Sequence, residues 1–318
     1  MQVENIAMPK PTTILITGAT GTVSSHLIAI LSRWPGIHLR ALVRDRTKAA
    51  NLQAHGIETF HGDLDIAGTL PGAFEGVDAL WLLTAPGPRT SENSMNALWA
   101  ARQAGVPRVV RLSAVGAASD APTRNGRLHA QSDHEVMVSG LQWTILKPHF
   151  YMQNLLALAP VIASQGALPY ALGDGKIGLI DTRDVADFAA QIFAAPDAHA
   201  GRTYTLTGPT ALSGNDIADS IGDSVKRTVR YVPISLHATR EAMLDAGASA
   251  WIADMVLEYC QAYASGWGDF VTRDFPQLMQ RQASTMANFA RDHAAAFGGT
   301  QRPPAEQATG TYTSTTHH

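Results

Sequence analysis

The sequence predicts an α/β protein built on a doubly wound parallel sheet, followed by a smaller, mainly helical C-terminal region. Two observations carry this prediction. Short apolar runs alternate with helix-like segments over the first 150 residues. The first run also leads directly into a glycine-rich turn and an amphipathic helix, which is the start of a strand, helix, strand unit.

The apolar runs are typical of buried parallel strands because they are short, continuous and rich in branched side chains. Between the first two, Leu27, Ile30, Leu31 and Trp34 recur at helical spacing until Pro35-Gly36 ends the pattern. We expect strands at Ile14 to Ile16, His38 to Val43, Ile57 to His61, Ala79 to Leu83, Val109 to Leu112, and Trp143 to Leu146.

The alternation weakens after about residue 150, which sets the expected domain boundary. We predict a Rossmann domain over residues 1–150, joined by later strands near 176–187 and 203–208, and a substrate-binding region over 151–297 that includes a helix from Ser249 to Ala264. Residues 298–318 are rich in Gly, Pro, Thr and Gln, so we expect a disordered, solvated tail.

Composition narrows the functional classes. The 318 residues hold 24 Lys and Arg against 27 Asp and Glu, and a net charge of −3 gives no basic field for nucleic acid or anionic lipid. The single cysteine, Cys260, forms no internal disulfide, and no Cys/His spacing indicates a metal site. With no secretory pattern in Met1–Lys10 and no membrane span, we expect a cytoplasmic protein; self-association is left open.

The turn after the first strand reads Thr17-Gly18-Ala19-Thr20-Gly21-Thr22-Val23-Ser24 and opens the helix. Gly18 permits a tight turn, Gly21 lets the backbone approach a pyrophosphate, and the helix N-terminus presents unpaired N–H groups. Ser24 stands where glycine or alanine is usual at the third position. The context predicts dinucleotide binding rather than a plain glycine turn.

Arg44 follows the second strand, where a side chain reaches the adenosine ribose. An arginine there pairs with a 2′-phosphate, and Arg46 and Lys48 add positive charge, so we predict NADP(H) in preference to NAD(H). Asp45 provides the alternative, because a carboxylate accepts from a free 2′-hydroxyl. Arg44 as a merely solvated strand-end charge is the other alternative.

Several further motifs occur in order along the chain. They are Gly18-Ala-Thr-Gly21, Val43-Arg44-Asp45, Gly62-Asp63-Leu64, Leu112-Ser113-Ala-Val-Gly116, Ser139-Gly140-Leu141, Trp143-Thr-Ile-Leu-Lys147-Pro148, Phe150-Tyr-Met-Gln-Asn154, Asp181-Thr-Arg-Asp-Val-Ala186, and Tyr204-Thr-Leu-Thr-Gly208-Pro209. From about Thr12 to Phe297, the sequence resembles the NmrA-like, atypical branch of the short-chain dehydrogenase/reductase superfamily. Lys147 replaces that family's usual arginine.

The resemblance implies a set of cofactor-binding residues. The pyrophosphate would be held by Gly18, Thr20, Gly21, Thr22 and Val23, the ribose phosphate by Arg44, the adenine by Asp63 and Leu64, and the nicotinamide side by Thr84, Ala85, Pro86, Ser113, Lys147 and Pro148. Asp63 has an equally good alternative as a helix cap or turn residue, and Ser113 as a hydroxyl that bonds the local backbone.

The usual catalytic dyad of this superfamily, a tyrosine and a lysine four residues later, is absent. Alignment on Ser139-Gly140-Leu141 puts Asn125 and His129 at those positions. Asparagine does not act as the acid, so we predict His129 as a catalytic group that titrates near neutral pH, or else as a polar surface residue. Asp133, one turn on, would orient His129 or pair with it at the surface.

The segment after Pro148 is expected to cross the carboxyl edge of the sheet. We predict that it binds a small, hydrophobic, aromatic substrate through His149, Phe150, Tyr151, Met152 and Asn154, with Tyr151 a second catalytic candidate. Trp251, Trp267 and Phe270 either join this pocket or, as the favoured alternative, form core between the domains.

The sequence and the resemblance together predict an NADP-dependent oxidoreductase that transfers hydride between nicotinamide and a flat conjugated acceptor such as a quinone or aromatic ketone. Two alternatives stay open, because a fold does not decide an activity. The first is an NADP-sensing regulatory protein without turnover, and the second is a non-redox catalyst on the same fold.

Overall fold

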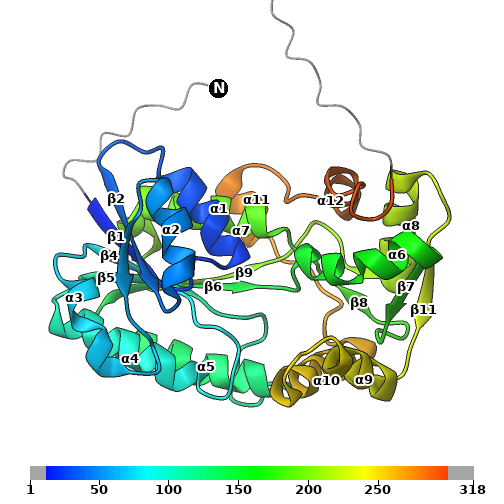
Figure 1. The fold of residues 1–318 in the computed structure, drawn as a ribbon, viewed down its shortest axis with the longest axis horizontal. Coiled ribbons are helices and arrows are strands. Elements are labelled where there is room, and N and C mark those ends of the chain that lie inside the picture. The colour runs from blue at the N-terminus through cyan, green and yellow to red at the C-terminus, as the bar shows by residue number, and fades with distance from the viewer. Residues whose placement is uncertain (1–11, 300–318) are drawn as a thin grey trace, which may run out of the picture.

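The computed structural model describes residues 12–299, except for the side chains of Arg46 and Lys48 (Figure 1). Its main sheet has seven strands in the order β3-β2-β1-β4-β5-β6-β9, all paired in parallel. The strands are β1 (Thr12–Ile16), β2 (Ile37–Val43), β3 (Glu58–His61), β4 (Ala79–Leu82), β5 (Arg108–Leu112), β6 (Gln142–Pro148) and β9 (Arg202–Leu206). The predicted doubly wound fold is confirmed.

Helices cover both faces of this sheet (Figure 1). One face carries α1 (Thr22–Leu31), α2 (Arg46–Ala54), α7 (Thr182–Ala194) and α11 (Asp274–Met279), and the other carries α3 (Pro71–Phe74), α4 (Thr90–Gln103) and α5 (Arg124–Val138). Successive side chains of a strand point to opposite faces. Ile14 and Ile16 therefore join the core under α1 and α7, whereas Leu15 joins the core under α3 and α4.

The strands predicted near 176–187 and 203–208 have different outcomes. The second is β9, which extends the main sheet beside β6. The first does not join the sheet: Lys176–Ile177 is a short strand, β8, paired antiparallel with β10 (Leu212–Ser213). The apolar residues after Asp181 have helical spacing and form α7. Asp181 caps this helix by accepting a hydrogen bond from the Arg183 amide at 2.8 Å.

The C-terminal lobe adds a third hydrophobic core beside the sheet (Figure 1). Besides β8 and β10 it holds a parallel strand pair, β7 with β11. Its elements are η2 (Met152–Leu158), α6 (Ala159–Gln165), β7 (Ala167–Tyr170), α8 (Gly214–Val225), β11 (Arg230–Pro233), α9 (Leu236–Asp245), α10 (Ala250–Ala264) and α12 (Met286–Asp292). Ser249 caps the predicted helix α10. Two 3-10 turns, η1 (Ala67–Thr69) and η3 (Pro196–His199), lie in connections of the first domain.

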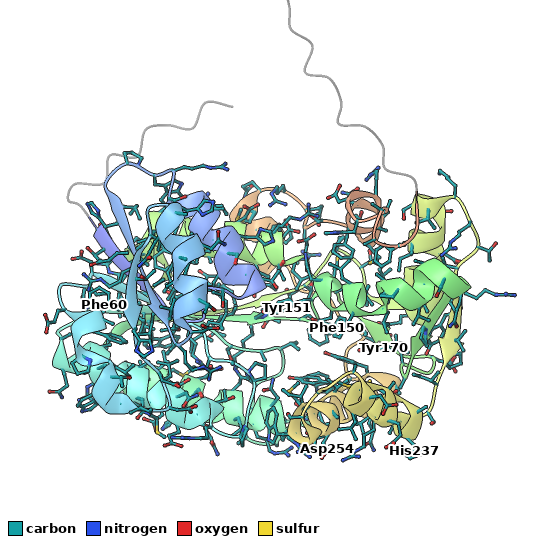
Figure 2. All side chains as sticks on the ribbon, viewed as in Figure 1. Phe60, Phe150, Tyr151, Tyr170, His237 and Asp254 are labelled. Carbon is teal, nitrogen blue, oxygen red and sulfur yellow. The ribbon has the colours of Figure 1, made fainter. Side chains whose placement is uncertain are left out.

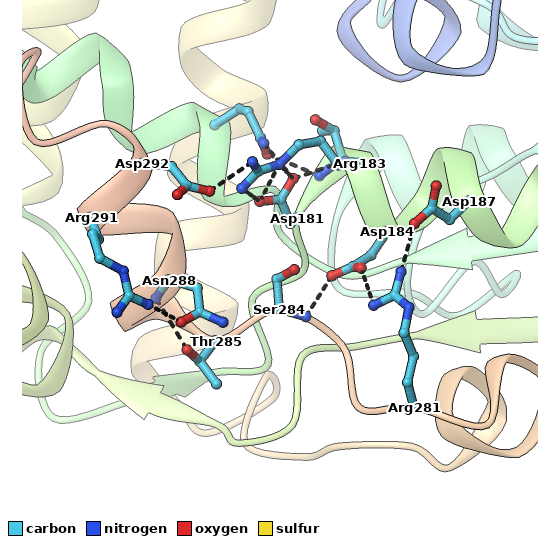
Figure 3. A network of polar contacts seen from close by, with 12 residues as sticks. Asp181, Arg183, Asp184, Asp187, Arg281, Ser284, Thr285, Asn288, Arg291 and Asp292 are labelled. Atoms are coloured by element: carbon cyan, nitrogen blue, oxygen red, sulfur yellow. Dashed lines mark hydrogen bonds and ion pairs between the residues drawn. The ribbon is translucent and has the colours of Figure 1, made fainter. Parts of the chain in front are cut away.

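Ion pairs attach the last segment of the described chain to α7 (Figure 3). Arg281 contacts Asp184 at 2.8 Å and Asp187 at 2.6 Å, and the buried Asp184 also accepts from the Ser284 amide. Arg183 contacts Asp292 of α12 at 2.7 Å. The chain after α10 therefore returns to the first domain, so that the two regions are interleaved rather than joined by one linker.

Within residues 12–299, no helix combines the length and apolar character needed to cross a membrane. Over the same part of the chain, no group of three or more His, Cys, Asp or Glu side chains could hold a metal ion. Of the predicted tail, only residues 298 and 299 are described, and the Gly299 amide donates to the Ala294 carbonyl at 2.8 Å. Residues 300–318, and Met1–Lys10, lie outside the described residues.

Candidate functional site at the carboxyl edge of the sheet

The glycine-rich turn lies where the strand order reverses, between β1 and β4. Gly18 has a φ of +60°, and a Cβ there would lie 2.4 Å from Leu83 Cδ2. The Thr17 hydroxyl donates to the Leu83 carbonyl at 2.8 Å, which holds the turn against β4. Ser24, the departure at the third position, is fully buried and accepts from Trp81 Nε1 at 3.0 Å. The serine hydroxyl is thus accommodated as a structural hydrogen bond.

Helix α1 begins at Thr22, its N-cap residue Gly21 provides no side-chain cap, and no acidic residue occurs in its first turn. Its first amides therefore lack helical partners and face the turn with the positive end of the helix dipole. A Cβ on Gly21 would approach the Gly18 carbonyl to 3.1 Å, so little space is spare. Thr20 and Thr22 are exposed and Val23 is buried. These features fit the pyrophosphate of a dinucleotide.

Two orphaned polar atoms lie further along the same edge. Thr84 Oγ1, after β4, and Asn125 Oδ1, in the first turn of α5, are buried and have no hydrogen-bond partner among the described residues. The two side chains belong to residues that are only 6% and 7% exposed. Buried polar atoms are normally paired, so this edge has the donor and acceptor character expected of a site for the polar end of a cofactor.

Arg44 is exposed at the end of β2, and its side chain makes no hydrogen bond or ion pair with the described residues. Asp45 Oδ1 instead accepts from the Thr47 amide at 2.9 Å and from the Thr47 hydroxyl at 2.7 Å, which caps α2. The alternative in which Asp45 serves a ribose hydroxyl is therefore disfavoured by its structural role. The predicted contributions of Arg46 and Lys48 fall on side chains outside the described set.

Asp63 and Leu64 follow β3 in a tight turn. The Asp63 carboxylate accepts from the Asp65 amide at 3.0 Å, which is the turn-forming alternative foreseen for it. Leu64 packs against the core under α3 and α4. Ala85 and Pro86 are exposed after β4. Contact of these four residues with adenine or nicotinamide stays a prediction.

A buried charge network lies below the edge, between β5, β6 and α5. Arg111 is fully buried on β5, and its Nε lies 3.0 Å from Asp133 Oδ1. The other carboxylate oxygen accepts from the Ser113 hydroxyl at 2.8 Å and lies 3.2 Å from Lys147 Nζ. Ser94 of α4 accepts from Arg111 at 3.0 Å. One carboxylate therefore holds two cations from neighbouring strands, and the cluster carries a net positive charge.

The structure differs from the predictions for Asp133 and His129. Asp133 is buried and contacts Arg111, Ser113 and Lys147, so it neither orients His129 nor pairs with it at the surface. His129 is also buried, with Nδ1 3.3 Å from Arg111 Nη2. Arginine only donates, so Nδ1 must accept and the proton resides on Nε2.

Burial, with the neighbouring charges of Arg111 and Lys147, lowers the pKa of His129 to about 3. The expectation that His129 titrates near neutral pH is therefore wrong: an imidazolium there would face two cations without water. His129 is a neutral hydrogen-bonding group at physiological pH. Ser113 and Lys147 both contact the Asp133 carboxylate, and Lys147 also donates to the Ala117 carbonyl at 3.0 Å; their contact with nicotinamide stays a prediction. Pro148 ends β6 and is buried.

The predicted substrate residues lie along the junction of the two regions, where Figure 2 labels Phe150 and Tyr151. Met152 is 1% exposed within the third core, and Phe150 packs edge-on against Tyr170 and Tyr263. Asn154 is exposed in η2. Burial raises the pKa of Tyr151, so its phenol stays protonated. Phe150 and Met152 thus act as packing residues in this structure, and their contact with a substrate stays a prediction.

His149 is enclosed by aromatic rings. Its imidazole stacks on Tyr263 at 5.7 Å between ring centroids and tilts against Phe270 at 5.1 Å, and its Nδ1 accepts from the Phe150 amide at 2.7 Å. Burial lowers the pKa of His149 to about 4. Trp267 packs on Tyr263, as in the core alternative, whereas Trp251 lines an open cavity of about 730 Å³ between α5 and α10 with Arg124, Arg127 and His134.

Two components of the site were not identified from the sequence. Arg111 was visible as a single charge inside an apolar strand, Val-Val-Arg-Leu, which is a signal for a buried ion pair. Tyr259 of α10 places its hydroxyl 3.0 Å from Asn125 Nδ2. The two residues are 134 positions apart in the sequence, and no pattern between them predicts this contact.

We expect Asp133→Asn to lower the free energy of unfolding by about 3 to 5 kcal/mol, because it leaves Arg111 and Lys147 as buried cations without a counter-charge. Urea denaturation measures the loss. Glu92→Gln in the exposed Arg89–Glu92 pair is the matched control, and water screening should make its effect small. A loss below about 1 kcal/mol for Asp133→Asn would contradict the assigned network.

Stability should also fall as the pH drops from 7 to 5. The folded-state pKa of His129 is about 3, below its ordinary value of 6.5, so the unfolded chain binds a proton that the folded chain excludes. The contribution of His129 to the free energy of unfolding is present above pH 6.5 and is lost as the pH falls toward 3. It amounts to about 2 kcal/mol between pH 7 and pH 5.

Urea midpoints at both pH values test this, because His129→Gln should reduce the pH-dependent loss by that amount. His237→Gln on α9, an exposed histidine labelled in Figure 2, should leave the loss unchanged. The same pH dependence in His129→Gln and in the unchanged protein would disprove the lowered pKa.

Comparisons with known proteins agree with the geometry. Residues 10–288 match the NmrA-like family. The chain is 39% identical to an NAD(P)H azoreductase of Xenophilus azovorans over 90% of this chain and 99% of that protein, and 29% identical to quinone oxidoreductase 2 of Escherichia coli over 77% and 86%. A solved structure of the NADPH-dependent quinone oxidoreductase of Escherichia coli, complexed with NADPH, superimposes with a TM-score of 0.79 at 27% identity, covering 88% of this chain and 99% of that one. The resemblance predicted from the sequence is confirmed, and this chain belongs to the NmrA-like family.

Proposed function

We propose that this chain is an NADP(H)-dependent oxidoreductase that reduces a flat conjugated acceptor, such as a quinone, an aromatic ketone or an azo compound. The observation that carries the proposal is the uncapped start of α1 behind Gly18 and Gly21, at the point where the strand order reverses. Ligands of open α/β sheets bind outside the carboxyl ends of the strands at such points. Near full-length similarity to a protein named NAD(P)H azoreductase supports the redox class.

The residues that would hold NADP(H) follow β2, β1 and β4 or lie in the first turn of α5, at the carboxyl edge of the sheet. The amides of Thr22 and Val23 face the pyrophosphate position, and the exposed Arg44 suits the 2′-phosphate. Thr84 and Asn125 supply buried oxygens without partners for a polar group at the other end. Bound NADPH would supply the hydride.

The chain's own groups at this edge mainly position the cofactor and the acceptor and polarise the acceptor. Lys147 and Ser113 share the Asp133 carboxylate, which orients both toward the end of β5. The net positive charge of the Arg111, Lys147 and Asp133 cluster favours an anion developing nearby. His129 keeps its Nε2 proton and acts as a neutral hydrogen-bond donor, since its low pKa removes the imidazolium form at pH 7.

One observation favours a second candidate, an NADP-sensing protein without turnover. Phe150 and Met152, the residues expected over the nicotinamide, pack against other side chains of the third core. Side chains held in that core are not available to a substrate, which suits a protein in which cofactor occupancy alters partner affinity. Turnover of an acceptor distinguishes the two candidates.

We expect NADPH to bind at least about tenfold more tightly than NADH, because a charge-assisted pair with Arg44 contributes about 1.5 to 3 kcal/mol. Arg44→Ala should erase most of this preference. Titration of nucleotide fluorescence measures both constants, and Arg33→Ala, an exposed arginine beyond the far end of α1, is the matched control. Equal affinities of the unchanged protein for NADPH and NADH would overturn the assignment of Arg44.

The protein should oxidise NADPH when 1,4-naphthoquinone or a phenylazo dye is added, measured as loss of nicotinamide absorbance against an enzyme-free blank. Gly21→Val is expected to abolish both cofactor binding and turnover, because its side chain fills the approach to the first amides of α1. Circular dichroism establishes that the variant is folded. Tight NADPH binding with no acceptor faster than the blank would reject the enzyme and favour the sensor.

A further inference from the structure

Tyr259 of α10 crosses from the C-terminal lobe to the first turn of α5. Its phenol oxygen accepts from Asn125 Nδ2 at 3.0 Å and also interacts with the Thr123 side chain. The Thr123 hydroxyl lowers the pKa of Tyr259, which is the effect of a donor to the phenol oxygen, and it accepts from the Gly126 amide at 3.0 Å. Two donors thus converge on the phenol oxygen. No group among residues 12–299 is recorded as an acceptor for the hydroxyl hydrogen of Tyr259.

An ion pair on the neighbouring residues fixes this approach. Arg124 Nε lies 2.8 Å from Glu258 Oε1, and the Arg124 amide donates to the same carboxylate. Arg124 and Asn125 are consecutive on α5, and Glu258 and Tyr259 are consecutive on α10. Two adjacent contacts therefore set both the distance and the rotation of α10 relative to α5. The Tyr259 ring also stacks on Tyr263 at 5.8 Å between centroids.

The phenol lies over the carboxyl edge of the sheet. Trp267, whose ring centroid is 6.3 Å from that of Tyr259, packs so closely on Gly116 that a Cβ there would lie 2.1 Å from the indole. Gly116 belongs to the loop that follows β5, and Asn125 Oδ1 is one of the orphaned atoms of this edge. Tyr259 is partly exposed, unlike the fully enclosed Tyr263.

We infer that Tyr259 is a catalytic acid that donates its phenol proton to the acceptor during reduction. The inference rests on the proposed function. As hydride from NADPH adds to the conjugated acceptor, the electron pair it displaces moves to the acceptor's oxygen or nitrogen. The Tyr259 O–H bond breaks and a new bond from that proton to the heteroatom forms. The resulting phenolate is held by the hydrogen bonds from Asn125 and Thr123, and a solvent proton restores the phenol.

The environment of Tyr259 suits this role in both protonation states. Burial raises the pKa of Tyr259, so the phenol carries its proton before reaction, and the hydrogen bonds of Asn125 and Thr123 act in the opposite direction. They stabilise the anion without supplying a competing acceptor for the proton. His129 and Tyr151 cannot replace it as readily. His129 lies beside the buried Arg111, which already donates to its Nδ1, and among residues 12–299 no donor to the Tyr151 phenol is found that would stabilise its phenolate.

The test compares Tyr259→Phe with the unchanged protein, using NADPH and 1,4-naphthoquinone. Loss of a general acid lowers the rate about a hundredfold or more, so we expect kcat to fall by that factor while the Kd for NADPH stays within about twofold. In the unchanged protein, kcat should be lower in deuterated solvent than in water, which gives a solvent isotope effect above one. Tyr204→Phe on β9, which removes a phenol bonded to His199 outside the site, should keep normal turnover. Unchanged kcat in folded Tyr259→Phe would overturn the inference.

A second measurement needs neither cofactor nor turnover. Naphthoquinone binding to the cofactor-free protein should quench tryptophan fluorescence, because Trp267 is a neighbour of Tyr259. Loss of one hydrogen bond to the quinone oxygen should raise its Kd about two- to tenfold in Tyr259→Phe. Asn125→Ala, which keeps the phenol, should raise it less.

The outcomes separate this inference from the proposed function. If the unchanged protein turns over no acceptor, the proposed function fails, while the quinone titration still judges the contact made by Tyr259. If turnover is normal in the unchanged protein and the quinone Kd is equal with and without the phenol, the proposed function stands and the role of Tyr259 is rejected. Matching thermal unfolding midpoints exclude misfolding as the cause of any loss.

Discussion

The buried contact between Arg111 and Asp133 is the interaction on which the candidate site depends. It joins the carboxyl end of β5 to α5, and the same carboxylate holds Lys147 from β6 and Ser113, which directly follows β5. A buried ion pair of this kind adds little net stability, but loss of either partner leaves an unpaired charge that costs several kcal/mol. The pair therefore fixes the position of α5 over the sheet. That position in turn sets where Asn125 and His129 lie, and it keeps the histidine neutral.

The second constraint comes from the C-terminal lobe, which completes the candidate site at the carboxyl edge of the main sheet. The Arg124–Glu258 pair and the adjacent Asn125–Tyr259 contact attach α10 to α5, while the ion pairs of Arg281 and Arg183 return the last segment to α7 (Figure 3). The lobe is thus held on both faces of the sheet. A phenol from a distant helix then reaches the turn of α5 where the short-chain dyad tyrosine would have been. The proton donor that α5 lacks is in this way supplied by α10.

The sequence was sufficient for features that depend on local pattern. Periodicity located the six strands of the first domain to within a few residues, and the glycine turn followed from its place between a strand and a helix. Features set by long-range packing were missed. The neutral state of His129 depends on its burial and on two cations from β5 and β6. The contact between Tyr259 and Asn125 depends on a helix that starts over 100 residues after α5. Lys176–Ile180 looked like a sheet strand, yet its pairing with β10 is decided by the lobe around it.

Direct hydride transfer is the central claim, and single-turnover reaction with NADPH deuterated at C4 measures it most directly. The protein, loaded with one equivalent of the labelled cofactor, is mixed anaerobically with a conjugated acceptor, and the absorbance decay is compared for each deuterated face. We expect fast decay, a primary isotope effect from one face only, and NADP⁺ as the nucleotide product. Decay no faster than that of free NADPH, with the labelled cofactor recovered unchanged from the protein, would contradict the account.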